Sequence, residues 1–174
     1  QTRKRTARLA AALQALGVGR LQTVSTMLAN TPEMVEAHYA VPAINAVLNT
    51  LNTRLDAPLL AWQLNHCEAQ VLITDREFAP VIAEALRILQ SDHRRTPIVI
   101  DVADSEYTGA GEQIGAHEYE ALLAAHAPLA RLDGPADEWD AIALNYTSGT
   151  TGNPKGVVYH HRGAHLGAVA NLLT

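Results

Sequence analysis

The chain has 174 residues, of which 48% are hydrophobic, and its formal net charge is -5 at pH 7. This length and apolar content suffice for one sizeable core, while the acidic balance excludes nucleic acid as a default partner. The single cysteine excludes an internal disulfide, and no apolar run reaches the roughly 18 residues of a membrane span. We therefore expect a soluble, cytoplasmic protein without a transmembrane segment.

The N-terminal segment predicts a helix followed by a short strand. Residues 3–16 carry leucines at helical spacing, and Gly17 is suited to end the helix because it tolerates a left-handed backbone. The leucines that share one face of this helix are Leu9, Leu13 and Leu16. Residues 24–28 are then typical of a strand.

The next helix should begin at the Thr31-Pro32 pair. Thr31 can cap the helix with its hydroxyl, and Pro32 fits the first helical position, where its missing N–H is harmless. The helix should reach Tyr39, and Pro42 should kink or divide it before the apolar segment that begins at Val47. A strand, a turn and a capped helix together indicate a β-α unit.

Two more units of this kind follow. Asp56 can cap a helix, and the strand at 71–74 ends in Asp75. A helix over 78–89 leads to a further strand at 97–101, which also ends in an aspartate. Two such strands joined by a helix imply a parallel sheet with crossover helices. We therefore predict an α/β fold with a largely parallel sheet flanked by helices.

The region that leads to the last strands is less regular. Residues 102–116 are predicted to be a surface excursion, and residues 117–125 a short helix. A turn-rich linker over 127–135 leads to an apolar run at 141–144, and a second apolar run follows at 157–158. Both apolar runs are predicted to be buried strands.

The segment between these runs, residues 146–156, has the composition of a phosphate-binding loop. Its hydroxyl residues can donate hydrogen bonds to phosphate, and they are Thr147, Ser148, Thr150 and Thr151. Its glycines let backbone N–H groups approach an anion, and they are Gly149, Gly152 and Gly156. Lys155 adds a positive charge. We predict a mobile loop on a rigid sheet, suited to holding phosphate.

The spacing within this loop excludes the commoner phosphate-binding motifs. A Walker A loop requires glycine where this chain has Pro154, and Ser or Thr where it has Gly156. The glycines within residues 17–19 do not begin a dinucleotide fingerprint, because Gln22 occupies the position of the third glycine. The chain is therefore predicted to be neither a P-loop NTPase nor a dinucleotide-binding enzyme.

The run T-S-G-T-T-G-N-P-K-G, from Thr147 to Gly156, resembles the signature of the adenylate-forming family, which includes acyl-CoA synthetases, luciferases and peptide-synthetase adenylation domains. Other segments resemble the N-terminal third of fatty-acyl or medium-chain acyl-CoA synthetases, and they are residues 31–34, 48–55, 71–75, 143–146 and 159–163. Two positions depart from the family pattern: Asn45, where glycine is usual, and Ala29, where proline often stands. These departures concern local packing more than nucleotide contact.

The resemblance implies an AMP-forming acyl-CoA synthetase, a ligase that activates a fatty or medium-chain acid with ATP and transfers the acyl group to coenzyme A. It implies that the loop stabilises the departing pyrophosphate, whose phosphates Mg²⁺ bridges. The implied nucleotide-binding residues are Thr147, Ser148, Gly149, Thr150, Thr151, Gly152, Asn153, Pro154, Lys155 and Gly156. Lys155, the implied catalytic residue, either contacts phosphate or tethers the loop to an acid elsewhere.

The resemblance also implies that residues 1–174 are an incomplete N-terminal nucleotide-binding subdomain whose parent chain continues. The family's aromatic-Gly-x-Thr-Glu segment, its ribose-binding aspartate and its C-terminal lid lysine have no match here. We therefore expect this region alone to be inactive and to bind ATP weakly or not at all. Two alternatives stay open: another adenylating ligase of the aryl-CoA type, and a non-catalytic nucleotide-binding scaffold.

Other candidate sites are weaker. His161 and His165 are four residues apart, but no acid or cysteine at suitable spacing completes a metal site, so none is predicted. Cys67 fits a small buried side chain better than a catalytic thiol. Trp62 and Trp139 are interpreted as packing residues. The sequence carries no signal for the oligomeric state.

Overall fold

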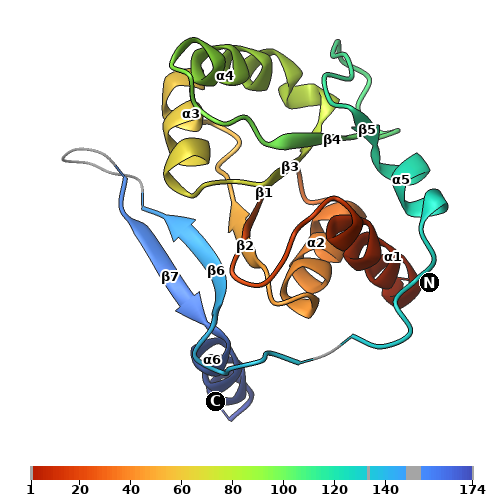
Figure 1. Cartoon of the computed structure of the whole chain (residues 1–174), viewed down its shortest axis with the longest axis vertical. Coiled ribbons are helices and arrows are strands. Elements are labelled where there is room, and N and C mark those ends of the chain that lie inside the picture. The colour runs from red at the N-terminus through yellow and green to blue at the C-terminus, as the bar shows by residue number, and fades with distance from the viewer. Residues whose placement is uncertain (1, 133, 148–153, 174) are drawn as a thin grey trace.

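The computed structural model describes residues 2–132, 134–147 and 154–173. In these ranges the strands are β1 (Thr23–Met27), β2 (Val47–Thr50), β3 (Val71–Asp75), β4 (Ile98–Val102), β5 (His117–Glu118), β6 (Ala141–Tyr146) and β7 (Gly156–His160). The helices are α1 (Thr2–Ala15), α2 (Pro32–Ala43), α3 (Ala57–His66), α4 (Ala79–Ser91), α5 (Tyr119–Ala125) and α6 (His161–Leu172), and a 3₁₀ turn covers Arg76–Phe78. The strands form one sheet in the order β5-β4-β3-β1-β2-β6-β7 (Figure 1).

The sheet is parallel from β5 to β6. β1 pairs with β2 and β3, β4 pairs with β3 and β5, and β6 joins the other side of β2. The registers place Val24 opposite Val71 and Leu48 opposite Ala143. β7 is antiparallel to β6 because it is the return strand of a hairpin. α2, α3 and α4 each connect parallel strands, so the predicted crossover architecture is confirmed.

Each face of the sheet has its own hydrophobic core. One core packs α1, α2 and α5 against the sheet and fully buries Leu9 and Leu13. The other core packs α3 and α4 on the opposite side and fully buries Leu60 and Ile82 (Figure 1). Each such side chain contributes roughly 1.5–3 kcal/mol when it leaves water. Within the described ranges, none of the helices is both long and apolar enough to cross a membrane.

The first helix ends as the sequence predicts. Gly17 has φ of 89°, in the left-handed region where glycine is favoured. The N–H of Gly17 donates to the carbonyl of Gln14, and the N–H of Val18 donates to the carbonyl of Leu13. These bonds satisfy carbonyl groups of the last turn and redirect the chain toward β1.

The start and the end of α2 differ from the prediction. Thr31 occupies the cap position, but its hydroxyl makes no cap hydrogen bond, so the predicted side-chain cap is wrong. Pro32 does occupy the first turn. Pro42 lies inside the last turn, and the helix ends at Ala43, so this proline precedes a helix end and does not divide a longer helix. The apolar segment at Val47 is strand β2.

The predicted helix over 117–125 begins two residues later. His117 pairs with Ile100 of β4 and therefore belongs to a short edge strand. Glu118 is the cap of α5, because its carboxylate accepts hydrogen bonds from the N–H groups of Glu120 and Ala121. A local strand pairing thus overrides the helical spacing at the first two positions.

Asn45 explains how the chain accommodates one departure from the family pattern. It has φ of 60°, a left-handed conformation in which asparagine is several-fold enriched among residues other than glycine. Its side-chain oxygen accepts a hydrogen bond from the N–H of Ala136 at 3.2 Å. The position needs a residue that tolerates a positive φ, and asparagine meets that need with one added contact.

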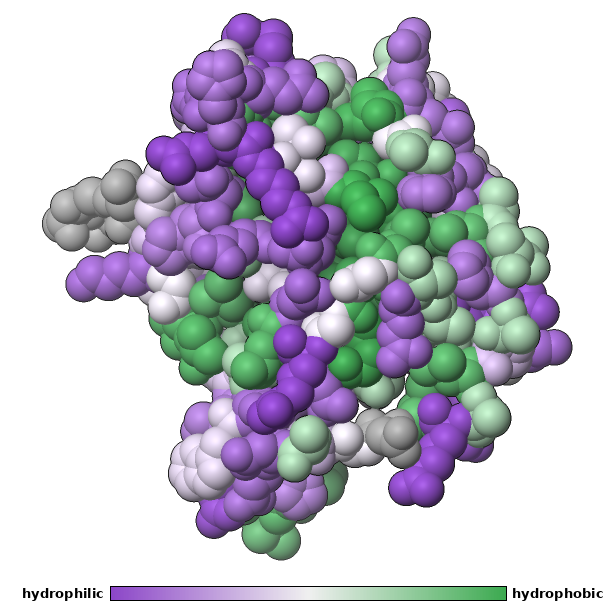
Figure 2. Space-filling view, viewed as in Figure 1, coloured by the Kyte–Doolittle hydropathy of each residue, from purple (hydrophilic) through white to green (hydrophobic). Residues whose placement is uncertain are grey.

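Both apolar runs near the loop form strands, as predicted, but the prediction that these strands are buried is wrong. β6 is half-buried along its length, whereas Val157 and Val158 of β7 are 41% and 62% exposed. β7 is an edge strand, so it pairs with β6 on one side, and no further strand of the described region covers the other side. Figure 2 shows apolar residues at the surface over this hairpin.

Candidate functional site

The predicted phosphate loop joins β6 to β7 at the carboxyl edge of the sheet. β6 runs parallel to β2, so Tyr146 at the end of β6 lies near Thr50 at the end of β2. Open α/β sheets bind their ligands at this edge. Part of the prediction lies outside the described residues, namely Ser148, Gly149, Thr150, Thr151, Gly152 and Asn153. The base of the loop is described and consists of Thr147, Pro154, Lys155 and Gly156.

Two hydrogen bonds close the base of the loop. The N–H of Thr147 donates to the carbonyl of Lys155 at 3.0 Å, and the N–H of Lys155 donates to Oγ1 of Thr147 at 3.2 Å. The next position is tightly packed, because a Cβ on Gly156 would lie 2.8 Å from a methyl carbon of Leu144, whose side chain would have to move, and 3.5 Å from the ring of Tyr146. The close approach of the two strands therefore sets where the loop begins and ends.

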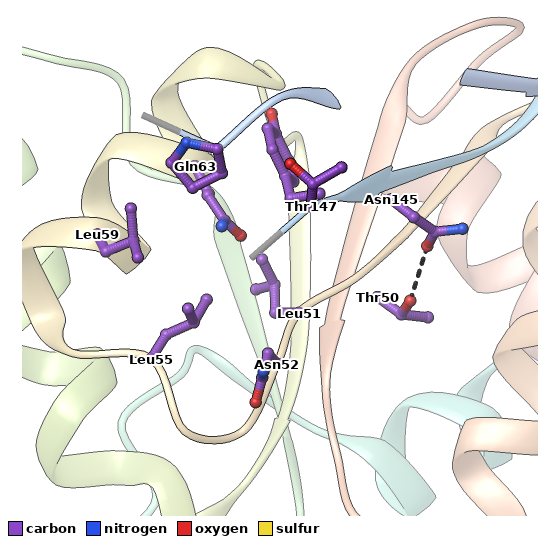
Figure 3. Close-up of a pocket in the computed structure, with 10 residues that line it drawn as sticks. Thr50, Leu51, Asn52, Leu55, Leu59, Gln63, Asn145 and Thr147 are labelled. Carbon is purple, nitrogen blue, oxygen red and sulfur yellow. Dashed lines mark hydrogen bonds between the residues drawn. The ribbon is translucent and has the colours of Figure 1, made fainter. Parts of the chain in front are cut away.

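A pocket of about 350 Å³ opens beside the base of the loop (Figure 3). It is formed by the turn after β2, one face of α3, the end of β6 and the loop base. The lining residues are Thr50, Leu51, Asn52, Leu55, Leu59, Gln63, Asn145, Tyr146, Thr147 and Pro154. None of these lining residues carries a charge, so the pocket itself is a neutral space of leucines, hydroxyls and carboxamides. Lys155, which carries a positive charge, follows the lining residue Pro154 in the chain.

Polar side chains, some buried and some half-buried, connect the strands at the pocket and beneath it. Nδ2 of Asn49 donates to the carbonyl of Leu144 at 2.8 Å, and Oγ1 of Thr50 donates to Oδ1 of Asn145 at 3.0 Å (Figure 3). Ser25 in turn donates to Oδ1 of Asn49 at 3.0 Å. Because these bonds join β1, β2 and β6, the loop rests on a rigid platform. The sequence analysis missed this contribution, although polar residues at the end of a predicted strand are a usable signal.

Gln63 is a second residue that the sequence analysis missed. Its side chain is on the pocket-facing side of α3 and is only 3% exposed (Figure 3). A carboxamide can both donate and accept hydrogen bonds, so a polar group lines the pocket on the side of α3. The sequence did contain a signal for this residue, because Gln63 is a polar residue among the apolar residues of a predicted helix.

The described loop residues differ in exposure. Pro154 is buried against the pocket, while Thr147 and Lys155 are exposed. The Lys155 ammonium makes no ion pair with any residue of the described ranges, so its role as phosphate ligand or as tether stays a prediction. Burial raises the pKa of the Tyr146 phenol, which keeps it protonated and able to donate a hydrogen bond.

Cys67 is a packed side chain, as predicted. It lies buried at the end of α3, with its sulfur 3.7 Å from Oγ of Ser25 and 3.7 Å from Oδ1 of Asn49. Burial raises the pKa of its thiol, and a thiol that stays protonated is a poor nucleophile. Its place beneath the β2 platform is structural.

The two histidines near the C-terminal end lie in different environments. His161 begins α6, is half-buried, and donates its backbone N–H to the carbonyl of Asp140 at 3.1 Å. Burial lowers the pKa of its imidazole. His165 is exposed. Within the described ranges, no group of three or more His, Cys, Asp or Glu side chains gathers in a way that could hold a metal ion.

The two tryptophans make packing contacts of different kinds. Trp62 is half-buried on α3 and stacks on His66. Trp139 is 62% exposed, and its ring lies 4.8 Å from that of His160. Both were interpreted as packing residues, but the packing of Trp139 occurs at the surface and not in a core.

Comparison with known proteins relates these features to a family. Residues 1–174 match the family described as AMP-binding enzyme. The chain is 44% identical over 183 residues to the peroxisomal acetate/butyrate–CoA ligase of Arabidopsis thaliana, which covers 99% of this chain and 32% of that protein. It is 42% identical over 186 residues to the peroxisomal trans-cinnamate:CoA ligase of Petunia hybrida, with 99% of this chain and 32% of that protein covered. The chain thus spans about a third of the length of these relatives.

Solved structures of CoA ligases share the fold. The chain resembles the anthranilate CoA ligase AuaEII, solved in complex with anthranoyl-AMP, with a TM-score of 0.83 and 26% identity over 97% of this chain and 30% of that chain. A benzoate CoA ligase from Burkholderia xenovorans has a TM-score of 0.77 at 22% identity, over 97% of this chain and 30% of that chain, which supports the fold alone. The predicted fold class, part of the N-terminal domain of an adenylate-forming enzyme, is confirmed.

The cytoplasmic location expected from composition is wrong. Several of the relatives are peroxisomal by name, among them the two plant ligases described above. Charge and the lack of a long apolar run separate membrane proteins from others, but they do not separate one aqueous compartment from another. Peroxisomal addresses are short signals read by receptors, and bulk composition carries no trace of them.

The family match extends over the whole chain, and the signature that suggested it lies between two strands at the carboxyl edge of the sheet. The relatives named above are ligases of coenzyme A with aliphatic or aromatic acids. The chain belongs to the AMP-binding enzyme family, and the members of that family named above are acyl- and aryl-CoA ligases.

Proposed function

We propose that the intact protein is an ATP-dependent acid–thiol ligase. It would convert a carboxylic acid into an acyl adenylate and pyrophosphate, and then transfer the acyl group to the thiol of coenzyme A. The observation that carries the proposal is the loop base, closed by Thr147 and Lys155 beside a pocket at the carboxyl edge of β2 and β6. Residues 1–174 would form the N-terminal nucleotide-binding subdomain of this enzyme.

The chemistry of the loop base fits a phosphate chain. The Thr147 hydroxyl accepts one hydrogen bond from Lys155, and its own proton stays available to donate to an anionic oxygen. The Lys155 ammonium is exposed next to it and supplies a charge-assisted donor. We assign no Mg²⁺ ligand within the described residues, because they bring no suitable cluster of side chains together. Bound Mg²⁺ would supply further neutralisation of phosphate charge.

The proposed role of the loop is to stabilise the leaving group. In the first half-reaction an oxygen of the acid forms a bond to the α-phosphorus of ATP while the bond to pyrophosphate breaks. Negative charge then builds on the pyrophosphate oxygens. Thr147 and Lys155 would bind this charge more strongly in the transition state than in the ground state, which is what lowers the barrier.

The acid is proposed to be short or aromatic. The sequence resemblance favoured a fatty or medium-chain acid, whereas the relatives are named for acetate, butyrate, cinnamate and benzoate. An aryl acid gains support from the structural likeness to an anthranilate ligase. Rates of AMP formation with acetate, butyrate, octanoate and benzoate would rank the candidates, and a clear preference for octanoate would restore the original expectation.

Replacing Lys155 tests the proposed function. We expect Lys155→Ala in the intact enzyme to slow carboxylate-dependent ATP–pyrophosphate exchange by roughly 10- to 100-fold, because one charged donor to the leaving group is lost. The matched control is Lys4→Ala, since Lys4 is also exposed but lies on α1. Unaltered exchange in Lys155→Ala would refute the role of this residue. Absence of exchange in the wild-type enzyme with every acid would refute the ligase and favour a non-catalytic scaffold.

A further inference from the structure

Three rings meet where α3 approaches the end of β6. Trp62 and His66 lie about one turn apart on α3, and their rings stack with centroids 4.7 Å apart and an interplanar angle of 22°. The ring of Tyr146, the last residue of β6, contacts both of them edge-on, at 5.8 Å from Trp62 and 5.7 Å from His66. We refer to Trp62, His66 and Tyr146 as the aromatic clamp. It joins α3 to the strand that leads into the loop.

A hydrogen bond gives the clamp a defined geometry. The hydroxyl of Tyr146 lies 2.7 Å from Nδ1 of His66. A neutral imidazole accepts the hydroxyl proton at Nδ1, and an imidazolium donates from Nδ1 to the hydroxyl oxygen, so the bond is compatible with either charge state. Stacking on Trp62 restricts the orientation of the His66 ring and directs Nδ1 toward Tyr146.

Tyr146 contacts both arms of the loop base. It precedes Thr147 in the chain and pairs with Gly156 across the hairpin. A Cβ on Gly156 would lie only 3.5 Å from the Tyr146 ring, so the ring lies directly against the returning strand. The two hydrogen bonds between Thr147 and Lys155 follow immediately beyond this pair. A displacement of the Tyr146 ring would therefore move both arms.

We propose that His66 is a positioning residue for the ligase reaction. By holding Tyr146 through Nδ1, His66 fixes the positions of Thr147 and Lys155 at the mouth of the pocket, where the phosphates bind. His66 is not among the residues that line the pocket, whereas Tyr146 is, so His66 acts through Tyr146. This inference rests on the proposed function of the loop.

A contribution to core packing does not explain the hydrogen bond between His66 and Tyr146. His66 is exposed and Tyr146 is half-buried, and neither belongs to the fully buried part of the core beneath α3. A bond between such residues adds little to global stability, but it can define a local geometry. We therefore infer that this hydrogen bond positions the loop base and adds little to the stability of the fold.

Three substitutions distinguish the contribution of ring stacking from that of the hydrogen bond. His66→Phe keeps a ring for Trp62 to stack on and removes Nδ1. His66→Asn loses the ring but places an amide close to the former Nδ1. Tyr146→Phe removes the hydroxyl alone. The matched control is His38→Phe, because His38 is an exposed helical histidine whose Nδ1 bonds to the Met34 carbonyl of its own helix.

The kinetic readout is ATP–pyrophosphate exchange by the intact enzyme. We expect kcat to fall roughly fivefold or more in His66→Phe and in Tyr146→Phe, with the KM for the acid unchanged, because one hydrogen bond that positions the loop is lost. The double variant should be no slower than either single variant. His66→Asn should keep most of the kcat, and His38→Phe all of it. Wild-type kcat in His66→Phe, or an equal loss in His66→Asn, would overturn the proposal.

Amide hydrogen exchange tests the clamp independently of catalysis. The N–H of Thr147 donates to Lys155, so its exchange rate reports opening of the loop base. We expect faster exchange at Thr147 in His66→Phe than in the wild type or in His38→Phe. If the wild-type enzyme catalyses no ATP–pyrophosphate exchange, the proposed ligase function fails, but amide hydrogen exchange still tests whether His66 holds the loop base. Equal amide exchange rates at Thr147 in His66→Phe and in the wild type would overturn the proposal that His66 positions the loop.

Discussion

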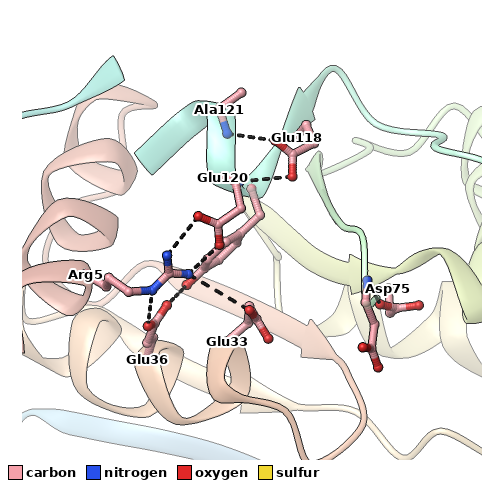
Figure 4. Close-up of polar contacts among 9 residues, drawn as sticks. Arg5, Glu33, Glu36, Asp75, Glu118, Glu120 and Ala121 are labelled. Carbon is pink, nitrogen blue, oxygen red and sulfur yellow. Dashed lines mark hydrogen bonds and ion pairs between the residues drawn. The ribbon is translucent and has the colours of Figure 1, made fainter. Parts of the chain in front are cut away.

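Glu36 is a buried carboxylate whose contacts hold three helices together (Figure 4). Its side chain is 2% exposed, and it accepts hydrogen bonds from Nε of Arg5 on α1 and from the hydroxyl of Tyr119 on α5. Arg5 also donates to both carboxylate oxygens of Glu120. Burial and the adjacent Glu36 raise the pKa of Tyr119, so its hydroxyl stays a donor. The charge of Glu36 is thus satisfied on both oxygens, as a buried charge requires.

Removing Glu36 should be more damaging than removing the Tyr119 hydroxyl. Glu36→Ala leaves the Arg5 guanidinium and the Tyr119 hydroxyl without their shared acceptor, and we expect a loss of about 3–5 kcal/mol in the free energy of unfolding. Tyr119→Phe removes a single hydrogen bond to the carboxylate and should cost about 2 kcal/mol. Urea denaturation measures both values. Equal losses in the two variants would show that the carboxylate is not the centre of the network.

At the scale of the element, two helices with similar start signals are capped differently. Oδ1 of Asp56 accepts a hydrogen bond from the N–H of Leu59 at 3.0 Å at the start of α3. Thr31 occupies the same position at the start of α2, but its hydroxyl makes no such bond. Both helices carry a proline in the first turn. The residue type predicts a possible cap, and the rotamer that packing selects decides whether the bond forms.

The cap difference predicts a ranking of two alanine variants. Asp56→Ala should destabilise the protein by about 1 kcal/mol, because an N–H group at the start of α3 loses its acceptor. Thr31→Ala should change the stability by less than about 0.5 kcal/mol, since no cap bond is lost. Chemical denaturation of the two variants side by side measures the ranking. A larger loss in Thr31→Ala would contradict the assignment of caps.

At the scale of the whole molecule, one end of the described region exposes much apolar surface. Its exposed apolar residues lie on β7 and at and around α6, and they are Val157, Val158, Tyr159, Leu166, Val169, Leu172 and Leu173. The chain corresponds to about a third of the length of its relatives. Both observations support the proposal that residues 1–174 form an incomplete subdomain, whose apolar edge packs against the rest of the enzyme.

The proposed subdomain, residues 1–174, should bind ATP poorly on its own. The pocket beside the loop is neutral, and a phosphate loop without an apolar wall for the base loses most of the contact area of a nucleotide site. We expect isothermal titration calorimetry of this 174-residue region to give a Kd of about 1 mM or weaker. Circular dichroism and a cooperative thermal transition serve as the control for folding. Micromolar affinity in a folded sample would contradict the prediction.

Local patterns were reliable predictors where one physical cause dominates. The continuous apolar runs at β3 and β4 predicted buried parallel strands, and Gly17 predicted the end of α1 through its positive φ. The loop signature predicted the family because its glycines, hydroxyls and lysine are contiguous. The exposure of β7 was not predictable from its apolar residues, because burial depends on which neighbours a strand has and not on the strand alone.

By itself the sequence predicted most of the strands and helices along the chain, though not β5 or α6, and it also predicted the α/β class and the family from the loop signature. Each of these depends on residues close together in the chain, where spacing and backbone preference act directly. Only the tertiary structure decided that β6 lies beside β2, and that Asn49 and His66 therefore bond to residues of the strand that leads into the loop. Asn49 bonds to a residue 95 positions away and His66 to one 80 positions away, and contacts at such separation come from strand pairing, which no local pattern records.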